Sequence, residues 1–318
     1  MKNKILVTGG TGLVGKAIEK YKNYIDTGYE YQFISSKDCD LINYQKTKDF
    51  FEKNRPDYVI HLAAMVGGLY KNMNYKVEML EKNLLINQNV LKCCHEFNVK
   101  KVVSCLSTCI FPDKTKYPIN EEMLHNGPPH DSSYCYAYAK RILEIQSKAY
   151  REQYGKNFIT VIPTNIYGEY DNYNLEDAHV IPALIHKCYL SKKNDKDFVV
   201  FGTGKPLRQF IYSVDLARLI IWCLKNYNDS ESIILAPDEK DEVSIKDIAL
   251  MIAKNFDYSD RIIFDSTKSD GQYKKTADNS KLRYLYAESG CNLNLIDINQ
   301  GIENTVKWFI DNYETSRK

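Results

Sequence analysis

A glycine-rich segment directly after the first apolar run constrains the fold of this chain more than any other feature. Residues 4–8 read Lys-Ile-Leu-Val-Thr, and residues 9–15 read Gly-Gly-Thr-Gly-Leu-Val-Gly. This order predicts a buried strand, a tight turn and a helix. Gly9 permits the turn, Gly12 lets a pyrophosphate approach the backbone, and Gly15 lets the helix close on the strand. The helix amides and dipole would hold the pyrophosphate, although a glycine turn that binds nothing is the alternative.

Strand and helix patterns then alternate along the first half of the chain. Apolar strand-like segments lie at 4–8, 29–34, 58–62, 101–106 and 158–162, and helix-like segments lie between them at 13–21, 43–54, 75–97 and 133–154. Such alternation predicts a parallel sheet with helices on both faces, because each parallel connection needs a crossover. We therefore expect an α/β fold of the Rossmann type, with a doubly wound parallel sheet.

The pattern changes beyond Pro163, where a loop, short strands and further helices replace the regular alternation. We expect helices from about 179, from a cap at Ser213, over 244–256 and over 297–313, and short strands near Val199 and Phe210. The sequence predicts a Rossmann domain at 1–165 and a smaller α/β lobe at 166–318. This lobe is interleaved with the first domain, to which residues of about 208–236 return.

Composition narrows the class of protein. Of the 318 residues, 44% are hydrophobic and 26% are charged, which excludes disorder, and the net charge of +2 gives no sign of a nucleic-acid or membrane surface. No stretch approaches the roughly 18 apolar residues that a membrane span needs. The nine cysteines are scattered without Cys-x-x-Cys spacing, so we expect reduced thiols, no metal site and a cytoplasmic location.

Residues after the second predicted strand bear on which nucleotide binds. A binding site for NAD usually has an acidic residue here, which takes the ribose 2′-hydroxyl. This chain has two serines, the second of them Ser36, and then Lys37, which suit a 2′-phosphate and favour NADP. Asp38 could still serve NAD. Asp40 and Leu41 follow as candidates for contact with the adenine.

Tyr136 and Lys140 lie four residues apart in a predicted helix and therefore share one face. A lysine cation beside a phenol favours the phenolate, so we expect Lys140 to lower the pKa of Tyr136. Tyr136 would then be the acid or base of an alcohol–ketone interconversion, although such pairs are also common on helix surfaces. Ser107 follows the strand that ends at Leu106, at the edge where open α/β sheets bind ligands, and would hold the same substrate oxygen.

In this order and spacing, the glycine pattern, Ser107, Tyr136 and Lys140 resemble the extended short-chain dehydrogenase/reductase superfamily of the type that modifies nucleotide sugars. Dehydratases of that superfamily carry Asp-Glu shortly after the serine. This chain has Thr-Cys-Ile there, so dehydration is not expected. Cys109 would instead remove a proton next to a ketone, and His179 would be the matching acid. The alternatives are a buried packing cysteine and a histidine that caps a helix.

Longer segments narrow the resemblance to the GDP-L-fucose synthase family. They lie at 61–68, 104–112, 163–165 and 201–210, and residues 268–271 and Asp278 continue the resemblance over essentially the full length. The resemblance implies a 3,5-epimerase/4-reductase that acts on GDP-4-keto-6-deoxy-D-mannose. It also implies NADPH/NADP as the cofactor and a homodimer joined through the two long helices.

The resemblance further implies roles for individual residues. Ser107, Cys109, Tyr136, Lys140 and His179 would be catalytic, with the division of C3 and C5 between Cys109 and His179 left open. The cofactor would contact Gly9, Gly10, Thr11, Gly12, Leu13, Val14, Gly15, Ser36, Lys37, Asp40, Leu41, Leu62, Ala63, Ala64, Tyr136, Lys140, Pro163, Asn165, Ile166 and His179. The substrate would contact Ser107, Asn165, Lys187, Phe201, Arg208 and Asp278, with Arg208 forking to the diphosphate.

The chain departs from the family at three of these positions, and two other functions remain open. Phe201 stands where members often have Trp, and Thr11 and Lys37 stand where some bacterial members have arginines around the 2′-phosphate. A nucleotide-sugar 4-epimerase would retain NAD, and Cys109 and Lys37 argue against it. A cofactor-sensing protein without activity would be expected to lose Tyr136 or its lysine partner, and both are present.

Overall fold

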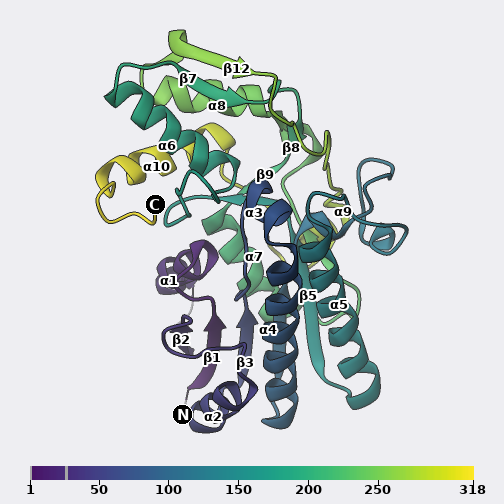
Figure 1. Ribbon diagram of the computed structural model, residues 1–318. Helices are drawn as coiled ribbons and strands as arrows, with labels where there is room; N and C mark the ends of the chain where they lie inside the picture. Colours follow the sequence, from purple (N-terminus) through teal and green to yellow (C-terminus); the bar gives the residue numbers. More distant parts are fainter. Residues whose placement is uncertain (1, 26–27) are drawn as a thin grey trace.

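The computed structural model describes residues 2–25 and 28–318, and its centre is a six-stranded sheet (Figure 1). The strands are arranged in the order β10-β5-β4-β3-β1-β2, and the pairings between them are parallel. Their bounds are β1 Asn3–Thr8, β2 Tyr29–Ile34, β3 Tyr58–His61, β4 Lys101–Cys105, β5 Asn157–Pro163 and β10 Ile233–Leu235.

Helices cover both faces of this sheet. Ile5 and Val7 of β1 point into a core formed with α1 (Leu13–Ile25) and α7 (Ser213–Asn226). Leu6, between them, points into the opposite core, because successive side chains of a strand alternate between faces. The helices on that side are α2 Tyr44–Asn54, α4 Lys76–Glu96 and α5 Tyr134–Tyr154. The prediction of a Rossmann-type, doubly wound α/β fold is confirmed.

Local sequence signals account for several helix ends. Asn43 caps α2 by accepting a hydrogen bond from the Lys46 amide, and Ser244 forms a capping box with Asp247 at the start of α8 (Ile245–Asn255). Gly155 ends α5 with a φ of 64°, a conformation that glycine adopts without strain. Ser213, predicted as a cap, is instead the first residue of α7, and Tyr212 occupies the cap position.

A second lobe, with its own core, lies above the carboxyl ends of the strands in Figure 1. Its helices include α6 Val180–Lys193, α8 and α10 Ile298–Asp311, and its strands pair as β7 Phe198–Phe201 with β12 Ile262–Asp265 and β8 Leu207–Arg208 with β11 Val243–Ser244. β6 Asn165–Tyr167 pairs with β9 Phe210–Tyr212 between the two cores. The remaining helical segments are α3 Leu69–Asn74, α9 Ser280–Glu288, η1 Thr108–Ile110, η2 Glu121–Met123, η3 Glu239–Asp241 and η4 Ser259–Arg261.

The chain enters the second lobe after β5 and then comes back to the central sheet. α7 packs on that sheet and β10 pairs with β5 at its edge, whereas α8, β12 and α10 belong to the second core. The predicted domain limits at 165 and 166 stay a prediction. Across the described residues, 2–25 and 28–318, no helix combines the length and apolarity that crossing a bilayer requires.

Candidate active site

A cavity of about 1070 Å³ lies where the carboxyl ends of the central strands face the second lobe. Loops after β1, β2, β3, β4 and β5 contribute to one wall, and the second lobe contributes the other. The predicted residues that line it are Gly9, Thr11, Gly12, Leu13, Val14, Gly15, Ser36, Asp40, Leu41, Leu62, Ala63, Ala64, Ser107, Tyr136, Lys140, Pro163, Asn165, Ile166, His179, Phe201 and Arg208. Gly10, Lys37, Cys109, Lys187 and Asp278 are outside this lining.

The glycine segment forms a tight cradle at the start of α1. Gly9 has a φ of 68°, and a Cβ on Gly15 would come within 2.6 Å of the Gly10 backbone. Gly10 is covered by Phe33 and donates its amide to the carbonyl of Ile34, which explains why it does not reach the cavity. A Cβ on Gly12 would meet only one carbonyl oxygen, at 3.3 Å. The cradle therefore leaves open space above Gly12, where a pyrophosphate fits.

A buried hydrogen-bond network holds the cradle next to the loop after β3. The hydroxyl of Thr8 lies 2.9 Å from Nδ1 of His61 and accepts the amides of Leu62 and Ala63 at 3.2 Å each. Nε2 of His61 is 3.1 Å from Oδ1 of Asn87 on α4. Burial is the main reason that the pKa of His61 falls to about 3, so this imidazole is neutral and structural.

The turn after β2 decides which side chains face the ribose. Asp38 accepts hydrogen bonds from the amide and hydroxyl of Ser35 at 2.8 and 2.7 Å, and these bonds keep its pKa below the usual range. The hydrogen bonds of this carboxylate are therefore made within its own turn. Lys37 lines an adjoining groove of about 440 Å³, which shares Ser36 and Asp40 with the main cavity.

Tyr136 and Lys140 lie on one face of α5, as predicted, with the ammonium 5.8 Å from the phenol ring centre. The expected pKa of Tyr136 is wrong: burial, and then the neighbouring Cys109 and Cys105, raise it far above its usual value. Lys140 does not compensate, because its ammonium donates to the Cys105 carbonyl at 2.8 Å and burial lowers its own pKa. Tyr136 is thus a neutral phenol, which can donate a proton.

Ser107 and Cys109 lie in the turn that follows β4. Oγ of Ser107 accepts the amide of Cys109 at 3.4 Å, so the hydroxyl caps the short helix η1 and still borders the cavity. Cys109 is half-buried and packs against the core beside α4 and α5. Burial raises the pKa of its thiol, and Lys275 and Ser107 oppose that rise. At neutral pH Cys109 is therefore a thiol.

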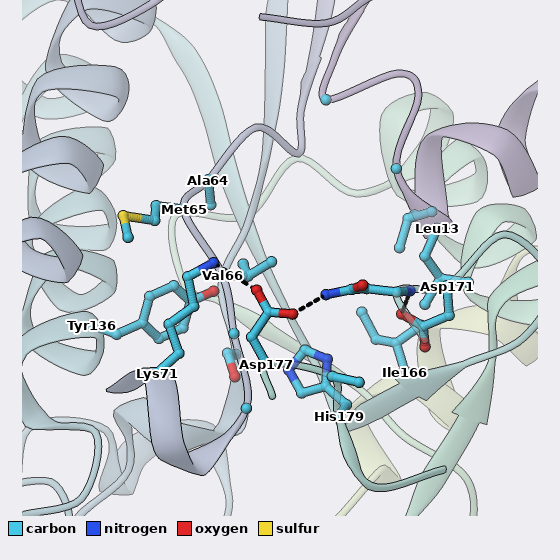
Figure 2. Close-up of a pocket in the computed structure, with 18 of the residues that line it drawn as sticks. Leu13, Ala64, Met65, Val66, Lys71, Tyr136, Ile166, Asp171, Asp177 and His179 are labelled. Carbon is cyan, nitrogen blue, oxygen red and sulfur yellow. Dashed lines mark hydrogen bonds and ion pairs between the residues drawn. The ribbon is translucent and has the colours of Figure 1, made fainter. Parts of the chain in front are cut away.

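His179 precedes α6 and reaches the cavity from the second lobe (Figure 2). It occupies the N-cap position of α6, as in the capping alternative, but its side chain makes no capping hydrogen bond to the helix. Although the ring is accessible from the cavity, the surrounding protein disfavours its charged form and lowers its pKa. Asp177 opposes this effect, while Lys275 and Arg317 add to it.

The other predicted substrate residues, apart from Ser107 and Asn165, come later in the chain. Nζ of Lys187 lies 3.3 Å from the ring centre of Phe201, so the two form one cation–π unit, in which Phe201 lines the cavity and Lys187 does not. Arg208 is committed to backbone carbonyls, donating to Leu207 at 2.7 Å and to Gln272. Asp278 accepts hydrogen bonds from the amide and hydroxyl of Ser280, the first residue of α9, and does not line the cavity.

Comparison with known proteins identifies the family. Residues 5–236 match the model of the NAD dependent epimerase/dehydratase family. The chain is 56% identical over 318 residues to the GDP-L-fucose synthase of Dictyostelium discoideum, covering 100% of this chain and 98% of that one. The chain belongs to the GDP-L-fucose synthase family. A probable GDP-L-fucose synthase of Drosophila melanogaster is 52% identical, covering 99% of each chain.

Solved structures of the GDP-L-fucose synthase family agree with this assignment. A GDP-L-fucose synthetase from Naegleria fowleri bound to NADP has a TM-score of 0.93 and 50% identity, and the match covers 99% of this chain and 95% of that one. A UDP-glucose 4-epimerase from Thermotoga maritima is 18% identical with a TM-score of 0.83, which shows a shared fold alone.

The sequence did not reveal four charged residues that lie near the predicted catalytic residues of this chain. Lys71, Asp177 and Arg317 line the cavity, and Lys275 acts electrostatically on both Cys109 and His179. None of these four residues belongs to a motif identified in the sequence. Burial lowers the pKa of Lys275 to about 8, and Arg208 adds to that effect. Only the folded chain places these charges beside the site.

Proposed function

We propose that this protein converts GDP-4-keto-6-deoxy-D-mannose to GDP-L-fucose, by epimerisation at C3 and C5 followed by NADPH-dependent reduction at C4. The observation that carries the proposal is one cavity lined by Tyr136, Lys140 and Ser107 on one side and by His179 on the other. The glycine cradle lies on the same cavity wall. Membership of the GDP-L-fucose synthase family supports this substrate.

The cradle and its surroundings fit a dinucleotide with a 2′-phosphate. The open space above Gly12 accommodates a pyrophosphate, and the Asp38 carboxylate already accepts two hydrogen bonds from Ser35. Lys37, in the adjoining groove, supplies a cation for the 2′-phosphate. NADPH, when bound, would supply the hydride for C4. Lys140 would hold the nicotinamide ribose.

In the reduction, Tyr136 would donate its proton to the C4 oxygen as that oxygen becomes an alkoxide. A raised pKa suits this role, because it keeps the phenol protonated until the alkoxide forms. Ser107, at the end of β4, would hold the same oxygen through its hydroxyl. The ammonium of Lys140 lies 5.8 Å from the phenol ring centre and would stabilise the phenolate that remains.

In the epimerisation, Cys109 would remove a proton next to the C4 ketone and His179 would return one on the opposite face. The ketone makes these protons acidic, so epimerisation precedes reduction. The thiol must be deprotonated while the imidazole is protonated. Because the pKa of Cys109 is raised and that of His179 is lowered, this pair is a minor form of the enzyme. The epimerisation rate plotted against pH would be bell-shaped. The pKa of His179 would set the acidic limb and the pKa of Cys109 would set the alkaline limb.

The second lobe would hold the GDP moiety. The Lys187–Phe201 unit offers an aromatic face for the base and a positive charge beside it. To bind the diphosphate, Arg208 would need to give up its present hydrogen bonds to backbone carbonyls. To accept a hydrogen bond from the ribose or the base, Asp278 would need to give up its bond to Ser280.

We also propose a homodimer joined through α4 and α5. These long helices lie side by side in Figure 1 and carry exposed apolar side chains at Leu85, Tyr138 and Ile145. Light scattering would test it: a monomer at micromolar concentration rejects the dimer. The nine cysteines are free thiols, seven of them buried, which supports a reducing, cytoplasmic setting.

The test of the function is one incubation in deuterated water. Purified protein, GDP-4-keto-6-deoxy-D-mannose and NADPH are mixed, and nicotinamide absorbance and product NMR are followed. NADPH consumption with deuterium at C3 and C5 of GDP-fucose is the expected result. Consumption without deuterium at those carbons would leave a plain 4-reductase, and no turnover would reject the proposed substrate.

A further inference from the structure

Asp177 links the loop before α6 to the segment around α3. Its carboxylate accepts hydrogen bonds from Nζ of Lys71 at 2.9 Å and from Nδ2 of Asn172 at 2.6 Å. Its backbone carbonyl accepts the amide of Gly68 at 2.8 Å. A Cβ on Gly68 would collide with the backbone oxygen of Ala178, so the two segments meet at close range. Residue 177 is thereby fixed from three directions.

These contacts of Asp177 lie at the cavity, beside His179, which is the proposed acid of the epimerisation. Figure 2 shows the Asp177 carboxylate between Lys71 and the His179 ring. Lys71, Asn172, Asp177 and His179 all line the cavity. The side chains of Lys71 and Asp177 are 24% and 28% exposed, so water screens their interaction only partly.

We propose that Asp177, held by Lys71, is a positioning residue that sets the location of His179 and stabilises its protonated form during epimerisation. The inference rests on the proposed function and extends it to two residues outside the catalytic set. Only one residue separates Asp177 from His179, so an anchored residue 177 restricts where the imidazole can lie.

The charges around His179 agree with this role. Lys275, Arg317 and burial all disfavour the imidazolium, and Asp177 is the anion that favours it. Burial by itself would raise the pKa of Asp177, but hydrogen bonds from Lys71 and Asn172 and the charge of Arg317 bring it below its usual value. Asp177 therefore ionises more readily than an ordinary carboxyl group, and its anion favours the imidazolium of His179.

The deciding experiment measures deuterium exchange at C3 and C5 against pH, without NADPH, so that reduction does not contribute. For Asp177→Asn, the acidic limb should move to lower pH by about one unit, because loss of a nearby anion lowers the histidine pKa. The plateau should fall by about tenfold for each such unit, since less of the imidazole is protonated. Glu176→Gln, an exposed neighbour in the same loop, should retain the wild-type profile.

Lys71 provides a second variant if Asp177→Asn fails to fold, as judged by thermal unfolding. Lys71→Met should slow exchange by about tenfold by releasing Asp177, and Lys71→Arg should restore most of the rate. A wild-type limb and plateau in folded Asp177→Asn, or full exchange in Lys71→Met, would overturn the inference. Absence of exchange in the wild-type protein would instead reject the proposed function.

Discussion

The ammonium of Lys140 donates a 2.8 Å hydrogen bond to the backbone carbonyl of Cys105, the last residue of β4. This bond ties α5 to the strand that leads into Ser107. It also occupies the Lys140 ammonium, which lies 5.8 Å from the ring centre of Tyr136, whose pKa burial raises. The phenol is consequently protonated and can act as the general acid in reduction. This role differs from that of Cys109, which would be the base in epimerisation.

Tyr136→Phe should therefore abolish reduction and spare epimerisation. We expect NADPH consumption to fall by about a thousandfold, since a positioned general acid contributes a factor of this order. Deuterium exchange at C3 and C5 should continue near the wild-type rate. Joint loss of both activities in a folded variant would contradict the division of roles.

Lys275→Met should move both limbs of the epimerisation profile to higher pH. The cation opposes protonation of His179, and it is itself charged below its pKa of about 8, so its removal raises the histidine pKa. It also favours the thiolate of Cys109, so its removal raises the thiol pKa. The exchange assay against pH measures both limbs, and Lys240→Met, at an exposed lysine, is the control. If both limbs of the pH profile stayed where they are in the wild type, Lys275 would have no electrostatic effect on Cys109 and His179.

Lys37→Met should weaken NADPH binding by roughly 10- to 100-fold, the usual value of a charge-assisted contact, and leave NADH binding unchanged. Fluorescence titration with each nucleotide gives the ratio. Lys48→Met, on α2 and paired with Glu96, should change neither affinity. Equal losses for NADPH and NADH would place Lys37 away from the 2′-phosphate.

Two glycines of the cradle should respond differently to alanine. Gly15→Ala places a Cβ 2.6 Å from backbone atoms of Gly10, so the variant should be destabilised by more than about 1 kcal/mol. Gly12→Ala meets only one carbonyl at 3.3 Å and should fold, yet it should bind NADPH poorly because the methyl group fills the pyrophosphate space. Urea unfolding and nucleotide titration separate the two effects.

Acid should destabilise the protein partly through His61. Its pKa is about 3 when folded, against 6.5 usually, so the unfolded chain binds the extra proton between these values. Stability from this group is therefore complete above pH 6.5 and is lost as the pH falls toward 3. In His61→Gln, the fall in unfolding free energy between pH 7 and about 5 should be smaller than in the wild type. An unchanged fall would show that His61 is not the titrating group.

Local sequence was enough for the first five strands of the central sheet, for most of the longer helices and for the residue types at the strand ends. It did not reveal the edge strand β10 or the helix α9. The glycine segment, the apolar runs and caps such as Asn43 act over a few neighbouring residues, and each appears where expected. The spacing of Tyr136 and Lys140 likewise follows from helix geometry alone. Their protonation did not follow, because the pKa of Tyr136 depends on burial by the whole fold.

What the sequence by itself determined was the doubly wound α/β fold, the nucleotide cradle and the set of candidate groups after each strand, because these follow from local periodicity and parallel connection. Only the tertiary structure decided which charges surround those groups. Lys71 and Asp177 are 106 residues apart, yet they meet at 2.9 Å, and Lys275 acts on Cys109 from the segment before α9. Electrostatic effects depend on distance in space and on local burial, and neither quantity is encoded in separation along the chain.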